Sequence, residues 1–247
     1  SAFAGNPYLI DLGALVDLGL LEASQITPLR RLSQERVDFG GVYHYKPPIL
    51  RLAFEKFQRD RQMRAPYGDF EAFKQRHARW LDPYALFAAL KDHFGGHPWT
   101  EWPAECANFS TALKSAAAKK VQVEAEAHRF FQYLFFGQWQ QLRAYAAERG
   151  ISIIGDIPIF VALDSADVWA NPHLFEFDRV KFQPLAAAGV PADYFAADGQ
   201  YWGNPLFNWE ANAAENYRWW LERLGAAFEL CDVVRIDHFR GLEKYRA

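Results

Sequence analysis

The chain has 247 residues, of which 51% are hydrophobic and 23% are charged, as expected for one large or two small globular domains. Its net charge of −3, with no basic stripe in the sequence, argues against a nucleic-acid partner. No apolar run reaches the roughly 18 residues of a membrane span, so no membrane association is expected.

Helical patterns dominate residues 1–150. After a Pro-Pro pair, the spacing of apolar residues predicts a helix over 49–61. A second helix is predicted to begin with Asp82 as its N-cap and to end at the Gly95-Gly96 pair. Residues 111–149 predict one or two further helices, whose aromatic face we assign to core packing rather than to a ligand.

The remaining sequence, 151–247, predicts a βαβ unit. The run "ISIIGDIPIFV" is typical of a buried parallel strand. The connection that follows, over 162–210, is far longer than an ordinary βα loop, which is typical of a lid or binding loop. A helix over 211–230 and the strand "CDVVRIDHF" over 231–239 complete the unit. We therefore predict an α/β fold that divides near residue 150.

Two carboxylates, Asp156 and Asp237, are expected at the ends of these strands, where parallel α/β folds carry their chemistry. Arg235 lies two residues before Asp237, so both side chains should point to the same side of the strand, where the cation would keep Asp237 ionised. An ionised carboxylate suits the nucleophile of a retaining glycosidase, and His238 could bind substrate hydroxyls. The alternatives are structural: a helix cap paired with Arg235, and a strand-end turn at Asp156.

Within the long connection, the stretch "GQYWGNP" combines amides with an indole. Gln200, Trp202 and Asn204 alternate along the chain. Amides can bind sugar hydroxyls, and an indole face packs against the apolar side of a sugar ring, so these residues form a candidate substrate site. An anchoring tryptophan followed by an Asn-Pro turn explains the same residues without a ligand.

We predict no metal site and no cofactor. His93 and His97 are four residues apart, but the two glycines between them interrupt the helix that chelation would need. No Gly-rich phosphate loop of the Walker or dinucleotide type is present in the sequence. Cys106 and Cys231 lack metal-ligand spacing and lie far apart, which favours a reduced, cytoplasmic setting.

Five segments together resemble one enzyme family, the 4-α-glucanotransferases called amylomaltases, or disproportionating enzyme in plants. The segments lie in the family's order and run nearly from end to end, whereas residues 45–110 match more loosely. They are "SAFAGNPYLIDL", "FFGQWQQLRAYAAERGI", "IGDIPIFVALDSADVWANPHLF", "AGVPADYFAADGQYWGNPLFNW" and "VVRIDHFRG".

The resemblance implies part of a (β/α)8 TIM barrel of the α-amylase-like type. Residues 1–150 would hold an early barrel connection with an inserted helical subdomain, and 151–247 a barrel segment. The implied reaction is retaining transfer of α-1,4-glucan segments to the 4-hydroxyl of a glucose or glucan acceptor, so the expected partners are maltooligosaccharides.

The resemblance also assigns roles to individual residues. Asp237 matches the catalytic nucleophile, and Arg235 and His238 match its neighbours at the cleavage subsite. Three other residues match side chains that contact or cover the bound glucan: Asp156, Gln200 and Trp202.

The family's acid/base glutamate and third catalytic aspartate are expected beyond Ala247, and a Ser-Pro-Tyr sugar contact before Ser1. We therefore expect about two of the eight barrel strands in this chain, and an isolated chain that is inactive and poorly stable because its strand edges are open. Two alternative functions stay open. An α-glucan hydrolase of the same clan would differ in its products, and a non-catalytic glucan-binding module would not need Asp237.

Overall fold

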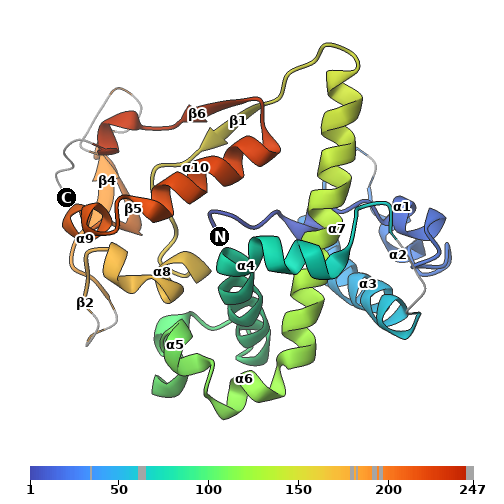
Figure 1. Cartoon of the computed structure of the whole chain (residues 1–247), viewed down its shortest axis with the longest axis horizontal. Coiled ribbons are helices and arrows are strands. Elements are labelled where there is room, and N and C mark those ends of the chain that lie inside the picture. The colour runs from blue at the N-terminus through green and yellow to red at the C-terminus, as the bar shows by residue number, and fades with distance from the viewer. Residues whose placement is uncertain are drawn as a thin grey trace.

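The computed structural model describes residues 1–33, 35–60, 65–178, 181, 183–190, 194 and 197–242 (Figure 1). The α-helices are α1 Leu12–Asp17, α2 Thr27–Arg30, α3 Phe39–Arg59, α4 Phe70–His93, α5 Phe109–Ala112, α6 Ala116–Lys120, α7 Gln122–Ala147, α8 Ala166–Ala170, α9 Trp209–Ala214 and α10 Arg218–Leu230. The strands are β1 Ile154–Ile157, β2 Phe177–Asp178, β3 Gln183–Pro184, β4 Ala187–Val190, β5 Gln200–Pro205 and β6 Val233–Ile236. Short 3-10 turns include Pro7–Leu9 and Phe239–Leu242.

Residues 1–150 form the helical part of the chain. The long helix α7 is at its centre, and α3 and α4 pack along α7 (Figure 1). Its apolar face follows the helical period, with Phe130 and Leu134 fully buried. The ring of Phe57, from α3, stacks on Phe130 at 4.6 Å between centroids. The aromatic stripe that the sequence predicts on this helix is therefore core.

Two predicted helix starts are wrong, because N-terminal caps further upstream prevail. Helix α3 begins before its Pro-Pro pair, where Asp38 accepts a hydrogen bond from the Gly41 backbone N–H at 2.8 Å. Helix α4 begins after Asp69, which caps Ala72 in the same way, and continues through its internal proline. Asp82 lies within this helix and pairs with Arg129 of α7 at 2.9 Å.

The predicted parallel strand pair is confirmed, although each strand is shorter than expected. Strands β1 and β6 pair in parallel, with Ile154 opposite Val233 and Asp156 opposite Arg235. Helix α10 directly precedes β6 in the chain and packs against both strands (Figure 1). This is the βαβ arrangement in which both carboxyl ends open on the same side.

The long connection between the strands is not a structureless loop. It contains α8, the antiparallel pair β2–β3 and the antiparallel pair β4–β5. The predicted helix over 211–230 is two helices, α9 and α10, separated where Asn216 and Tyr217 adopt positive φ angles of 54° and 53°. The described residues of this long connection therefore form local helices and strands of their own.

One apolar cluster joins residues from both sides of residue 150, including Trp99, Trp169 and Trp219. The predicted division of the chain there stays a prediction. Within the ranges that the structure describes, we find no helix with the length and apolar character that crossing a membrane requires.

Candidate active site

The β1–β6 register sets the geometry of the candidate site. Asp156 and Arg235 face each other near the carboxyl ends of the strands, and Asp237 follows β6 directly. The backbone N–H of Asp237 donates to the Ile157 carbonyl at 2.9 Å, which extends the strand pairing by one step. The predicted meeting of Asp156 and Asp237 at one edge of the sheet is therefore what the structure shows.

Arg235 joins the two carboxylates. Its Nε and one terminal nitrogen donate to the two carboxylate oxygens of Asp156, at 3.0 and 2.9 Å. The same terminal nitrogen donates to Asp237 Oδ1 at 2.9 Å. The hydrogen bonds that Arg235 donates to Asp156, followed by the charges of Asp156 and Asp237, raise the pKa of Arg235. The guanidinium thus stays charged and fixes the direction in which each carboxylate points.

All three side chains are open to solvent. Arg235, Asp156 and Asp237 expose 63%, 54% and 58% of their side-chain surface. An exposed ion pair contributes little to folding stability, because water screens it. In this chain the three side chains therefore contribute little to folding stability.

The long connection reaches this site through Trp202. The Trp202 ring lies 5.4 Å from the His238 ring, edge to face, and its indole N–H donates to Gln200 Oε1 at 3.0 Å. His238 adopts a positive φ of 54°, a strained conformation for a non-glycine residue. Strand β5 thus brings an indole and an amide beside the residues that follow β6.

Asn204 has a structural contact. Its side-chain amide donates to the Val161 carbonyl at 2.8 Å, and the side chain is partly buried. This contact ties β5 to the segment that follows β1. Binding of substrate by Asn204 stays a prediction, as do the roles assigned to the other predicted site residues.

One buried residue near the site was missed by sequence reasoning. Arg223 of α10 is 3% exposed and donates to the carbonyls of Pro158 and Ile159, just after β1. The signal was available: Arg223 follows the buried Trp219 and Trp220 by four and three residues, which places it on the apolar face of the helix.

In the part of the chain that the structure describes, no three His, Cys, Asp or Glu side chains gather as metal ligands would. His97 is paired with Glu101 at 3.2 Å, and the ring of His93 packs against Phe94.

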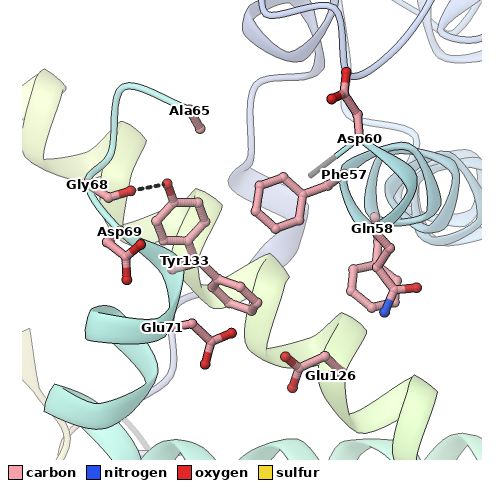
Figure 2. A pocket seen from close by; sticks show the side chains of 11 residues that line it. Phe57, Gln58, Asp60, Ala65, Gly68, Asp69, Glu71, Glu126 and Tyr133 are labelled. Atoms are coloured by element: carbon pink, nitrogen blue, oxygen red, sulfur yellow. Dashed lines mark hydrogen bonds between the residues drawn. The ribbon is translucent and has the colours of Figure 1, made fainter. Parts of the chain in front are cut away.

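A pocket of about 290 Å³ lies elsewhere, in the helical part (Figure 2). Phe57 and Tyr133 project into it, and Glu71 and Glu126 lie at its edge (Figure 2). Lys74 pairs with both glutamates, at 2.9 and 2.6 Å, so their charge is already compensated. The pocket contains none of the predicted site residues.

The sequence is similar to those of known 4-alpha-glucanotransferases. A family model described as 4-alpha-glucanotransferase matches residues 1–246. The 4-alpha-glucanotransferase of Streptococcus pneumoniae is 43% identical over 99% of the chain and 48% of its own length; that of Thermus thermophilus is 46% identical with the same coverage. The chain spans about half the length of the curated relatives it matches.

A solved structure gives the same result for the fold. The amylomaltase from Streptococcus agalactiae in complex with acarbose superposes with a TM-score of 0.85 at 36% identity, over 97% of this chain and 48% of that one. The predicted fold class, part of an α-amylase-like (β/α)8 barrel, is confirmed by this likeness.

Proposed function

The chain belongs to the 4-alpha-glucanotransferase family, and from this we propose that it carries the nucleophile side of a retaining transfer of α-1,4-glucan segments. The observation that supports the proposal most is the joining of Asp156, Arg235 and Asp237 at the carboxyl ends of two parallel strands. Transfer to a 4-hydroxyl of glucose or a glucan would make maltooligosaccharides both donors and acceptors.

In the proposed reaction, Asp237 attacks the anomeric carbon of the donor. The bond from that carbon to the leaving oxygen breaks as the bond to the Asp237 carboxylate forms, giving a covalent glucosyl-enzyme. A carboxylic acid protonates the leaving oxygen, and the resemblance assigns this acid to a residue outside 1–247. Arg235 holds Asp237 in the attacking orientation through the 2.9 Å hydrogen bond, and Asp156 fixes Arg235 in turn.

Transfer rather than hydrolysis requires that a sugar hydroxyl, not water, attacks the anomeric carbon of the glucosyl-enzyme. The bond from that carbon to the Asp237 carboxylate then breaks, and the hydroxyl proton passes to the conjugate base of the acid that protonated the leaving oxygen. We assign the exclusion of water to Trp202 and Gln200 on β5, with His238 as a partner of the indole. The similar amylomaltase is described in complex with acarbose, which supports a ligand of that kind here.

A cytoplasmic location is proposed from Cys106 and Cys231, both free thiols.

The test uses the complete natural polypeptide that carries this sequence, incubated with maltotriose. A transferase gives glucose together with a ladder of longer maltooligosaccharides. Glucose and maltose without longer products would instead support a hydrolase. Binding of maltotriose with no products at all would support a glucan-binding module. Asp237→Asn should abolish the ladder while maltotriose binding, measured by calorimetry, persists.

A further inference from the structure

Four of the five residues that follow Asp156, at 157–161, have backbone carbonyls that accept hydrogen bonds from three different parts of the chain. The Ile157 carbonyl accepts from the Asp237 backbone N–H at 2.9 Å. The Pro158 and Ile159 carbonyls accept hydrogen bonds from the Arg223 guanidinium, the one to Ile159 at 3.1 Å. The Val161 carbonyl accepts a hydrogen bond from the Asn204 side-chain amide at 2.8 Å. We call these residues the 157–161 segment.

This segment is the point to which the candidate site residues are attached. Asp156 precedes it directly, and Asp237 hydrogen-bonds to its first residue. Its Phe160 ring packs at 6.4 Å from the ring of Trp202 on β5. A shift of the segment would therefore move the nucleophile, its neighbouring carboxylate and the β5 side chains relative to one another.

Arg223 is the buried anchor of the segment. It comes from α10, which runs alongside the β1–β6 pair (Figure 1), and it is 97% shielded from solvent. Its guanidinium lies 5.4 and 5.0 Å from the ring centroids of Trp219 and Trp220. The carbonyls it binds lie beyond the β1–β6 ladder, whose register ends at Ile157 and Ile236.

The buried position of the Arg223 guanidinium has an energetic cost. Burying such a charge is unfavourable unless hydrogen bonds and nearby charge compensate. Burial lowers the pKa of Arg223 to about 10, against the opposing charge of Asp167. A methionine would fill similar space without that penalty, but it would leave two carbonyls without their donor. The geometry that only an arginine supplies here is a fork that binds two successive carbonyls.

We propose that Arg223 is a positioning residue of the transfer reaction: by fixing the Pro158 and Ile159 carbonyls, it holds the 157–161 segment in the one arrangement that aligns Asp237, Asp156 and β5. Asn204 completes the arrangement by tying β5 to the end of the same segment. The inference rests on the proposed function for its catalytic consequence, but the attachment itself is a property of the fold.

The experiment compares Arg223→Met and Arg223→Lys with Arg218→Met in the complete polypeptide. Arg218 is the matched control, because it is an exposed arginine on the same helix. With maltotriose, Arg223→Met should lower kcat on the order of 10- to 100-fold, the effect of a small misplacement, while KM changes little. Arg223→Lys, which can still bind one carbonyl, should recover part of the loss. The control should behave like the parent protein.

Hydrogen exchange separates this inference from the proposed function. The Asp237 amide, which donates to Ile157, should exchange faster in Arg223→Met than in the control, whether or not the protein transfers glucan. If the parent forms no products but this exchange difference appears, the transferase proposal fails and the attachment stands. An unchanged kcat and unchanged Asp237 exchange, in a variant that only unfolds at lower temperature, would show Arg223 to be merely structural and overturn the inference.

Should Arg223→Met not fold, Asn204→Ser provides the second test at a partly buried position. The shorter side chain cannot reach the Val161 carbonyl. The expected result is a larger share of hydrolysis relative to transfer, with Trp202 fluorescence more accessible to a soluble quencher. Unchanged product ratio and unchanged quenching would contradict the attachment of β5 to the 157–161 segment.

Discussion

Arg235 donates two hydrogen bonds to the Asp156 carboxylate across the parallel strand pair, from Nε at 3.0 Å and from a terminal nitrogen at 2.9 Å. That terminal nitrogen also donates to Asp237, so a single guanidinium orients two carboxylates. The three side chains meet because a parallel register places Asp156 directly opposite Arg235.

Arg235→Lys should abolish most transfer activity with almost no loss of stability. The lysine ammonium is a compact charge without the planar fork of a guanidinium. It cannot donate two parallel hydrogen bonds to Asp156 and also bind Asp237. Because the ion pairs are exposed, the urea midpoint should change little. The measurements are the initial rate on maltotriose and the denaturation midpoint. A variant with normal rates would show that charge alone, without the fork geometry, is sufficient.

Trp202→Ala should shift the products from transfer towards hydrolysis. Removing the indole opens the space beside His238 and admits water to the glucosyl-enzyme. The neighbouring Tyr201→Ala is the control, since Tyr201 is 81% exposed on the same strand. The ratio of longer maltooligosaccharides to free glucose reports the effect. An equal shift in both variants would contradict a specific role for Trp202.

Asp232 should make the start of β6 sensitive to acid. Its carboxylate accepts from the Ile153 N–H at 2.8 Å and from Arg143 at 2.6 Å, and these hydrogen bonds, with that of Ile153 first, lower its pKa. A carboxyl with a lowered folded-state pKa stabilises the fold above its unfolded value, about 3.9, and this contribution is lost as the pH falls through the folded value.

Urea denaturation between pH 7 and pH 3 tests this expectation. Asp232→Asn should show a smaller loss of stability below about pH 4 than the parent, because it lacks the titrating group. Asp17→Asn, at an exposed position at the end of α1, is the control and should follow the parent curve. Parallel curves for Asp232→Asn and the parent would remove Asp232 from this role.

Gln132→Leu should destabilise the helical part. The Gln132 side chain is fully buried and bonds both backbone groups of Gly5, its Oε1 to the N–H at 2.8 Å and its Nε2 to the carbonyl at 2.9 Å. Leucine would leave both groups buried without these partners, at a cost of about 1–3 kcal/mol each. Gln141→Leu, exposed on the same helix, is the control for the free energy of unfolding measured in urea. Equal stability of the two variants would contradict the expectation.

Much of the site could be predicted because it depends on strand geometry. Alternation along β6 places Arg235 and Asp237 on one side, and the parallel βαβ arrangement brings Asp156 to the same edge. The helix starts could not be predicted from the Pro-Pro pair or from Asp82, because the caps that set them, Asp38 and Asp69, lie further upstream and both helices continue through their prolines. The attachment through Arg223 and Asn204 depends on backbone carbonyls whose direction a residue pattern does not specify.

The central claim is that Asp237 is the nucleophile, and trapping the covalent intermediate tests it most directly. A fluorinated maltosyl fluoride carries a leaving group that needs little protonation, so attack by the nucleophile is the step that labels the protein. After reaction of the complete polypeptide and peptic digestion, mass spectrometry should locate the maltosyl mass on Asp237, and Asp237→Asn should stay unlabelled. A label on Asp156, or labelling that persists in Asp237→Asn, would contradict the account.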